Sequence, residues 1–472
     1  MNIKESVAKL FSGSVLNAII QFAAIVGFTQ ALGAGAVGSF FIYQAVIGML
    51  GIPVDLGTSR ASEKRLSANE PPGEVISTVV LLKAALTVPW IVALFLATPY
   101  VEQYVGIPGI VPLVVVGLVA SQAERLALRL LAGQLRVAQN ALLQVLGQLV
   151  WVGGGFVLID AGWGATAIIA SLVLGYATTI LGALVRLDLA VGWPRLSRAR
   201  DLMNFGRYVF IGDVGSYIYQ WMDVAVLRLF VPLPLIGAYE IAWRVASIST
   251  LLTQAIRASL FPQISAWYSE DRLDKIESAF FTWMQVPLYL TIPAFAGAVV
   301  LGEDVLGTLF GPQVTVAYPV LVIFMLESIL RSVQLVVGPS LFAMDQPQLG
   351  YRGSAAAIVT NLTLNFALIP VFGLIGAAVA TTLGAAVAAA VAIWYVSDFV
   401  TLRVPWSRVG WSALSATVMA GIVFGIRTLL PPGALRLAVG VGAGAAIYFL
   451  LLLAQRGIRV ELTDAVQSVR GS

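Results

Sequence analysis

Residues 204–262 read NFGRYVFIGDVGSYIYQWMDVAVLRLFVPLPLIGAYEIAWRVASISTLLTQAIRASLFP. The stretch holds two apolar runs, each long enough to cross a bilayer as a helix. These runs nevertheless carry five charged residues, namely Asp213, Asp223, Arg228, Glu240 and Arg244. One charge at the centre of a bilayer costs about 2.5–3.5 kcal/mol on insertion scales, so each needs a partner, water or a charged ligand. The hairpin is therefore the first candidate site; alternatively, its charges only pair with one another and orient the helices.

The composition of the whole chain is that of a polytopic membrane protein. Mean hydropathy is +0.91, and 59% of the 472 residues are hydrophobic while 11% are charged. The apolar runs are about 20–28 residues long, which favours membrane-spanning helices over the short alternating segments of barrel strands. No long polar stretch interrupts them, so we expect an all-α polytopic fold without a separate soluble domain.

Apolar runs separated by Pro, Gly or charged breaks predict fourteen transmembrane helices. Their ranges are 8–32, 37–60, 75–97, 109–133, 139–159, 163–186, 205–230, 235–260, 277–301, 315–338, 353–370, 373–397, 407–428 and 434–455. We expect an N-terminal six-helix lobe over residues 1–200 and a second six-helix lobe over residues 201–400. Residues 401–472 would supply two additional helices and a cytoplasmic tail.

An internal repeat supports the two lobes. Residues 11–46 align without a gap on residues 210–245 after a shift of 199 positions. Identical pairs include Phe11 with Phe210, Gly13 with Gly212, Val15 with Val214, Ile19 with Ile218, Gln21 with Gln220, Gly38 with Gly237 and Val46 with Val245. Because both segments begin on the same side of the membrane, the repeat is parallel, and it predicts pseudo-symmetric lobes related by an axis along the membrane normal.

Basic residues predict the orientation of the chain. They gather in alternate loops, as the positive-inside rule requires for the cytoplasmic side. Outer loops without Lys or Arg lie near Gly35, Glu102, Asp160, Pro232, Glu303 and Val371. Arg427 and Arg436 are the exceptions. We therefore expect a multi-pass protein of the cell membrane, plasma or inner, with both termini cytoplasmic.

The residue types exclude several kinds of chemistry. Cysteine and histidine are both absent, which removes thiolate and imidazole ligands and leaves Asp or Glu to carry any proton. No catalytic set or metal cluster can be assembled, so we expect no enzyme, no metal and no cofactor beyond a coupling Na⁺ or H⁺. A membrane glycosyl polymerase or ligase is the enzyme alternative, but those enzymes usually use a sizeable outer loop. The basic excess serves topology, so nucleic acid is not an expected partner.

Two acid–base couples at a spacing of four residues can pair on one helix face. Glu240 and Arg244 form the first couple, and Glu327 and Arg331 form the second, for which we favour a structural ion pair. Asp55 on the second span and Lys83 on the third lie at similar depth and can pair as well. A structural bridge explains that pair at least as well as a ligand site does.

Three arginines have a simpler interpretation. Arg228 lies near the outer end of its span, where a long side chain can reach the membrane interface. Arg125 and Arg129 lie at the inner end of the fourth span. We interpret these two residues as topology anchors.

Short motifs distributed over the chain resemble one family. Residues 364–381 read LNFALIPVFGLIGAAVAT, which resembles a hallmark of the oligosaccharide flippases of the multidrug/oligosaccharidyl-lipid/polysaccharide exporter superfamily. Other matching places are Ala31–Gly33 with Gly38–Phe41, Asp55–Gly57, Ile236–Tyr239 with Ala242–Arg244, and Phe261–Pro262. The motifs specify the superfamily well and the flippase branch less well, and they do not specify the substrate.

The resemblance implies two six-helix lobes in a V around a central cavity, with alternating access. It implies a flippase that carries a polyprenyl- or dolichyl-linked oligosaccharide, on phosphate or diphosphate, from the cytoplasmic to the outer leaflet. The alternatives are a multidrug exporter driven by Na⁺ or H⁺ and a peptidoglycan-precursor (lipid II) flippase. Fourteen spans favour a flippase, since those exporters generally have twelve.

The resemblance also implies where the substrate binds. The family places cationic residues in the cavity, and Arg244 matches best, with Asp55 and Asp223 at positions often kept acidic. The candidate cavity residues are Arg244, Glu240, Asp223, Asp213, Asp55 and Lys83. A sugar-phosphate headgroup needs such a wet, cationic path across the hydrocarbon layer. The implied partners are the lipid-linked oligosaccharide, membrane lipids and other polysaccharide-assembly proteins.

Overall fold

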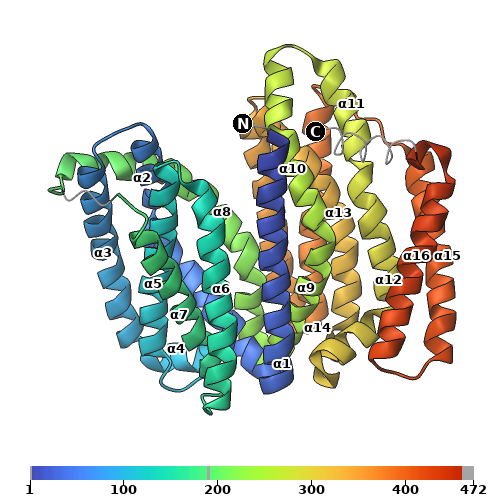
Figure 1. Ribbon diagram of the computed structural model, residues 1–472, viewed down its shortest axis with the longest axis horizontal. Coiled ribbons are helices and arrows are strands. Elements are labelled where there is room, and N and C mark those ends of the chain that lie inside the picture. Colours follow the sequence, from blue (N-terminus) through green and yellow to red (C-terminus); the bar gives the residue numbers. More distant parts are fainter. Residues whose placement is uncertain (1–2, 189–191, 460–472) are drawn as a thin grey trace. The chain divides into compact units, whose positions relative to one another are not determined.

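A computed structural model describes residues 3–188 and 192–459. The side chains of residues 3–15 and of 208, 209, 211–214, 216, 218 and 219 lie outside the described part. Every regular element of the described chain is a helix, as expected from the composition (Figure 1). The chain divides into two compact units, Met1–Gly237 and Ala238–Ser472. The predicted lobe boundaries follow the internal repeat and stay a prediction.

Eleven helical segments of the described chain are long and apolar enough to cross a membrane. Two of them are broken at a glycine, one that lies between two predicted spans and one that is the first residue of a predicted span. Gly33 has φ 80° and ψ 168° inside α1 (Ile3–Asp55), and Gly373 has φ 54° and ψ −126° inside α14 (Pro347–Ser397). Only glycine adopts such conformations readily, because it has no Cβ. The two breaks therefore lie where the sequence predicts hairpin turns.

The first unit packs its helices around aromatic side chains. Besides α1 its elements are α2 (Thr58–Ser67), α3 (Pro72–Leu96), α4 (Thr98–Val105), α5 (Val111–Gly133), α6 (Val137–Asp160), α7 (Ala165–Leu184), α8 (Leu196–Phe230) and the start of α9 (Leu233–Ser247). The helix α6 packs on α7 and α1, and α5 packs on α2 and α7. The Trp151 ring stacks on Phe40 with centroids 5.6 Å apart, and its Nε1 donates to the Ile168 carbonyl at 3.1 Å. This core joins α1, α6 and α7.

The second predicted span, 37–60, ends early. The helix α1 stops at Asp55, and the polar helix α2 begins at Thr58. Gly57 between them has φ 73°, and a Cβ there would lie 2.4 Å from the Gly206 carbonyl oxygen. The left-handed turn and the close approach of α8 both require glycine. The turn places the polar side chains of α2 at the end of α1.

Two glycines related by the internal repeat contact each other in the first unit. A Cβ on Gly38 would lie 2.1 Å from the Leu233 carbonyl oxygen, and one on Gly237 would lie 2.0 Å from the Ala34 carbonyl oxygen. Leu233 is itself the counterpart of Ala34 after the shift of 199 positions. The contact is thus reciprocal, and small residues let the two backbones approach closely.

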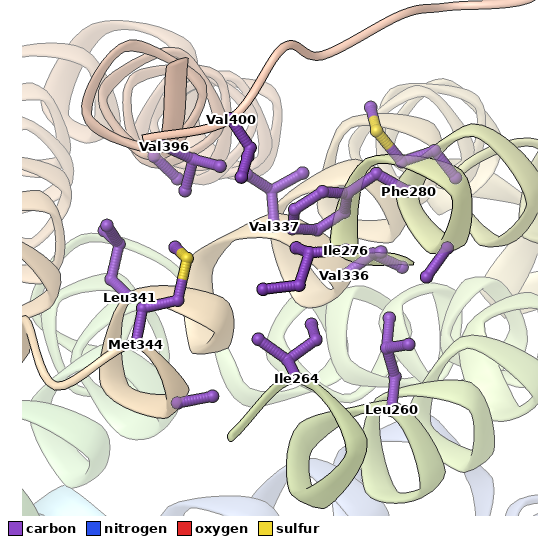
Figure 2. Packing of buried hydrophobic residues seen from close by; sticks show 14 of the residues in the cluster. Leu260, Ile264, Ile276, Phe280, Val336, Val337, Leu341, Met344, Val396 and Val400 are labelled. Atoms are coloured by element: carbon purple, nitrogen blue, oxygen red, sulfur yellow. The ribbon is translucent and has the colours of Figure 1, made fainter. Parts of the chain in front are cut away.

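The second unit is built around α10, α11, α13 and α14. This unit contains the remainder of α9 and the whole of α14. Its other elements are η1 (Ile248–Thr250), α10 (Leu251–Ser269), α11 (Leu273–Trp283), α12 (Gln285–Phe310), η2 (Pro312–Ala317), α13 (Tyr318–Ala343), α15 (Trp406–Leu429) and α16 (Ala434–Ala454). Figure 2 shows Ile264, Phe280, Val337 and Val396, one from each of these four helices, in one buried cluster. The last two helices, α15 and α16, pack on each other and on α12 (Figure 1).

The two arginines that break the positive-inside pattern are paired with acids in the second unit. Arg427 Nη2 lies 2.9 Å from Glu303 Oε2, and Arg427 Nε lies 2.9 Å from Asp304 Oδ2. Arg436 also pairs with Asp304. Two positive charges thus meet two negative ones, so this end of α12, α15 and α16 carries little net charge. This pairing explains how the exceptions are tolerated.

Candidate functional site

Asp55 and Lys83 form a buried ion pair in the first unit. Lys83 Nζ lies 2.5 Å from Asp55 Oδ1, and both residues are at most 6% exposed. Lys83 Nζ also donates to Gln122 Oε1 at 3.1 Å, and the Ser59 hydroxyl donates to Asp55 Oδ1 at 2.5 Å. Hydrogen bonds to both members offset part of the cost of burying the charges. The pair allowed by the sequence is therefore formed.

A cavity of about 260 Å³ opens beside this ion pair. It is lined by Asp55, Ser59, Arg60, Arg125, Arg129 and Tyr217. These residues come from α1, α2, α5 and α8, all in the first unit. The turn at Gly57 explains why α2 contributes Ser59 and Arg60 next to Asp55. The cavity is slightly smaller than the pockets of about 300–1,000 Å³ that hold drug-sized ligands.

Cationic groups outnumber anionic groups at this cavity. Of the lining residues, Asp55 pairs with Lys83 of α3, and Arg129 Nη1 pairs with Glu63 Oε2 of α2 at 2.9 Å. Arg60 and Arg125 add two further guanidinium groups. Among the side chains that the structure describes, the charged lining residues are three arginines and one aspartate, and the ion-pair partners Lys83 and Glu63 add one charge of each sign. Such a cavity attracts anions.

Arg125 is held over an aromatic ring of α8. Its guanidinium carbon lies 5.1 Å from the centroid of the Tyr217 ring, within cation–π range. This contact orients a planar group that can donate to two oxygens of a phosphate or carboxylate at once. Ser59 and Tyr217 add hydroxyl groups, which suit sugar hydroxyls and phosphate oxygens. The cavity thus combines charge with uncharged hydrogen-bonding groups.

A network of ion pairs fixes the beginning of α8 against α2 and α3. Its contacts are Arg65 with Glu70 (3.1 Å) and Asp201 (2.7 Å), Arg195 with Glu74 (3.0 Å), and Arg198 with Glu70, Glu74 (3.8 Å) and Asp201 (3.9 Å). Exposed pairs of this kind contribute about 0–1 kcal/mol each, and more when linked in a network. The network helps to position the helix that supplies Tyr217.

The second unit holds the two predicted couples with four-residue spacing. Arg244 Nη2 lies 3.7 Å from Glu240 Oε2, and Arg331 Nη1 lies 3.5 Å from Glu327 Oε1. The Ser328 hydroxyl lies 3.4 Å from the Ala246 carbonyl oxygen, which places α13 beside the end of α9. Both couples are therefore formed as expected, on neighbouring helices. Their ligand-binding role stays a prediction.

Three residues of the opening hairpin belong to the first unit. Asp223 is 7% exposed on α8, and the side chain of Asp213 lies outside the described residues. Arg228 donates from Nε to the Tyr104 carbonyl and from Nη2 to the Gln103 carbonyl, both at 2.7 Å. Cations at a helix C-terminus are stabilising, so Arg228 anchors the end of α4. The Tyr104 hydroxyl in turn donates to the Ala225 carbonyl at 2.9 Å.

Sequence reasoning missed part of this cavity. The sequence analysis does not select Arg60 or Tyr217, and it interprets Arg125 and Arg129 as topology anchors. The available signal was the four-residue spacing of Arg125 and Arg129, which puts them on one face of α5. The positive-inside rule explains such arginines equally well, so sequence alone gives no reason to prefer a cavity.

The comparisons with known proteins establish the family. Residues 32–319 match the model of the family described as polysaccharide biosynthesis protein. The chain belongs to this family. It is 37% identical over 460 residues to the probable low-salt glycan biosynthesis flippase Agl15 of Haloferax volcanii, with 97% of each chain covered. It is 31% identical to the probable flippase AglR of the same organism, with 89% of each chain covered.

Solved structures show the same fold at low sequence identity. The lipid II flippase MurJ in an inward closed conformation matches with a TM-score of 0.80 and 13% identity, covering 94% of this chain and 98% of that one. An inward-facing multidrug resistance transporter of the MATE family matches with a TM-score of 0.60 and 16% identity, covering 81% and 94%. This member of the polysaccharide biosynthesis family therefore has the fold of the exporter superfamily that its motifs resemble.

Proposed function

We propose that this chain is a flippase for a lipid-linked oligosaccharide. The substrate would be a polyprenyl- or dolichyl-linked oligosaccharide on phosphate or diphosphate, moved from the cytoplasmic to the outer leaflet by alternating access. The observation that carries the proposal is the cavity between Asp55, Arg60, Arg125 and Tyr217, with its excess of cationic groups. The names of the relatives Agl15 and AglR, both probable flippases, support the same function.

The chemistry of the cavity suits a sugar-phosphate headgroup. Guanidinium groups bind phosphate oxygens through paired, charge-assisted hydrogen bonds. The volume suits the phosphate end of a headgroup with an adjoining sugar. Moving that anion through hydrocarbon without such groups would cost several kcal/mol. The polar groups of the cavity take the place of the water molecules that solvate the headgroup outside the membrane.

The same charge argues against the multidrug alternative. A cavity lined by Arg60, Arg125 and Arg129 disfavours a cationic drug. The acids predicted to carry a coupling ion, Asp223 and Glu240, are each 7% exposed or less, and that role stays a prediction. Transport unaffected by both Asp223→Asn and Glu240→Gln would remove it. A peptidoglycan-precursor flippase stays an alternative, since its substrate also has a phosphate headgroup.

The proposal includes fourteen spans in two six-helix lobes with two further helices. The breaks at Gly33 and Gly373 support counting α1 and α14 as two spans each. With the 35-residue helix α8 as a further span, the eleven candidate segments become fourteen. We place the chain in the cell membrane with both termini cytoplasmic, where other polysaccharide-assembly proteins could supply and consume its substrate.

Reconstitution of the full chain in liposomes tests the proposed function. Lipid-linked oligosaccharides with a fluorescent sugar are placed in one leaflet, and their arrival in the other is followed by quenching with an impermeant reagent. We expect translocation of anionic, lipid-linked sugars and none of a cationic dye. Equal transport by protein-free liposomes, or transport of the dye alone, would refute the proposal. A panel of lipid carriers and sugars then separates an oligosaccharide from a peptidoglycan precursor.

A further inference from the structure

Arg129 lines the cavity of the first unit, but an acid of the protein already contacts its guanidinium group. Arg129 Nη1 donates to Glu63 Oε2 of α2 at 2.9 Å. Arg125, which also lines the cavity, lies four residues earlier on α5, and side chains at this spacing share one helix face. The two arginines therefore face the same cavity, and a carboxylate of the chain itself occupies a donor of one of them.

The ion pair of Arg129 and Glu63 is accessible, unlike the pair that Lys83 forms with Asp55. The side chains of Arg129 and Glu63 are 41% and 30% exposed, whereas those of Lys83 and Asp55 are 7% and 8% exposed. Partly exposed ion pairs are weak and typically shift an equilibrium by about fivefold or less. A buried pair costs much more to separate. An entering anion can therefore replace Glu63 far more readily than it can replace Asp55.

The packing of α2 on α5 does not depend on this ion pair. A Cβ on Gly133, one turn after Arg129, would lie 2.9 Å from the backbone oxygen of Glu63, so the two backbones are in close contact. Leu66 of α2 and Leu130 of α5 are buried in the same apolar cluster. This packing holds the two helices together. The side chain of Glu63 can thus leave Arg129 by rotating about its own bonds while the helices stay in place.

A phosphate group can make better contacts with Arg129 than Glu63 does. Glu63 accepts through one carboxylate oxygen from one guanidinium nitrogen. A phosphate group can accept from two guanidinium nitrogens at once. Its attraction to a cation also grows with its charge. A doubly charged anion therefore gains more from Arg129 than the single carboxylate that it would replace.

We propose that Arg129 is a binding residue for the headgroup phosphate and that Glu63 holds this position while the cavity is empty. The entering anion displaces the carboxylate, which turns toward solvent, and the guanidinium group then binds the headgroup beside Arg125. The exchange keeps Arg129 paired with an anion before and after binding. The inference rests on the proposed function, because it assumes that the headgroup enters this cavity.

Sulfate binding to the purified full chain tests this exchange. Calorimetric titration in detergent solution, at constant ionic strength, measures the affinity. We expect Glu63→Gln to bind sulfate about two- to fivefold more tightly than the wild type, because the neutral amide competes less well for Arg129. Arg129→Gln should bind sulfate more weakly. A loss of folding would lower the affinity, so a tighter Glu63→Gln variant cannot be explained by structural damage.

The double variant Glu63→Gln with Arg129→Gln distinguishes direct exchange from general repulsion. If Glu63 acts by occupying Arg129, its removal should bring a clearly smaller gain in affinity once Arg129 is gone. An equal gain with and without Arg129 would show that Glu63 only repels anions at a distance, which contradicts the inference. Asp188→Asn is the matched control, since it removes an acid of the same unit that pairs with Arg136 at 2.7 Å. It should bind sulfate like the wild type.

Arg125→Gln separates this inference from the proposed function. If sulfate fails to bind the wild type, or binds equally well to Arg125→Gln, the cavity assignment and the proposed function are contradicted. If binding depends on Arg125 but Glu63→Gln brings no gain, only the roles of Arg129 and Glu63 are overturned.

Transport in liposomes distinguishes the headgroup from a free anion. We expect Glu63→Gln to lower the half-saturating concentration of the lipid-linked sugar by about the same two- to fivefold factor, and Arg129→Gln to raise it. If both variants change sulfate binding but leave the half-saturating concentration unchanged, Arg129 binds free anions only and the inference is wrong.

Chemical labelling of the wild type covers the case in which the variants do not fold. A water-soluble carbodiimide couples an amine to accessible carboxyl groups, and peptide mass spectrometry locates the modified residues. At constant ionic strength, sulfate should increase the modification of Glu63, because displacement exposes its carboxylate, and should leave Asp188 unchanged. The absence of any increase at Glu63 would refute the exchange without any variant.

Discussion

Arg125 is the residue on which the account depends most. It lines the anion-attracting cavity, and its guanidinium group lies over the Tyr217 ring. A topology anchor needs only a positive charge at the right end of a helix. A planar guanidinium group can lie over the Tyr217 ring and still donate to two oxygens of one anion, which an ammonium group does not do in the same geometry. Arginine and lysine are therefore not equivalent at this position.

The buried pair of Asp55 and Lys83 predicts a non-additive effect on stability. Lys83→Met leaves an unpaired carboxylate, and losing one partner of a buried pair costs about 3–5 kcal/mol. The double variant Asp55→Asn with Lys83→Met removes both charges, so we expect it to recover most of the loss. Thermal unfolding of the purified proteins measures both effects. Equal destabilisation by the single and the double variants would show that the charges do not interact as the structure indicates.

Arg244 is the residue that the family resemblance selects for contact with the headgroup phosphate. We expect Arg244→Ala to fail in complementing a flippase-null host, because neutralising it leaves Glu240 buried without the cation 3.7 Å away. Expression is matched by quantifying the protein in membranes. Normal complementation would exclude the predicted role. Arg272→Gln, which alters an exposed ion pair with Glu270 in the same unit, serves as the control.

At the scale of elements, glycines at helix contacts and turns determine how the helices are arranged. The sequence predicted the long apolar helices, because apolar runs and Pro or Gly breaks mark where spans begin and end. It did not predict the polar helix α2, which begins after the left-handed turn at Gly57. A pattern of spans says which segments cross the membrane. It does not predict the direction in which the chain continues after a turn.

The reciprocal contact of Gly38 and Gly237 predicts a strict size limit. A methyl group on Gly38 would lie 2.1 Å from a backbone oxygen, so α1 and α9 would have to separate. We expect Gly38→Ala to destabilise the protein by about 1–3 kcal/mol, the usual cost of overpacking. Gly35→Ala is the matched control, because its methyl would meet Pro234 Cγ at an ordinary 3.5 Å. Similar melting temperatures for the two variants would contradict this packing.

At the scale of the whole molecule, the fold is predictable from the sequence, whereas the candidate site is only partly predictable. Composition and motifs sufficed for an all-helical membrane protein of the exporter superfamily. They also brought Asp55 and Lys83 together as a possible pair. They could not reveal the cavity, because Arg60, Arg125 and Tyr217 come from separate helices and meet only after folding. Charges in spans and charges at span ends look alike in sequence, and only their contacts distinguish them.

The predicted orientation is testable because the natural chain contains no cysteine. Single cysteines can be introduced at Asp160, expected outside, and at Arg272, expected inside. In intact cells, an impermeant maleimide should label Asp160→Cys and spare Arg272→Cys, and membrane disruption should expose both. The reverse labelling pattern would invert the topology.

Transport by Arg125→Gln in proteoliposomes tests the central claim most directly. The assay measures the initial rate at which a lipid-linked, diphosphate-bearing oligosaccharide crosses the bilayer, with reconstitution checked by protein quantification. Losing a charge-assisted phosphate contact of about 1.5–3 kcal/mol predicts a roughly 10- to 150-fold lower rate at subsaturating substrate, with Arg272→Gln at the wild-type rate. An undiminished rate for folded Arg125→Gln would show that the cavity does not carry the headgroup.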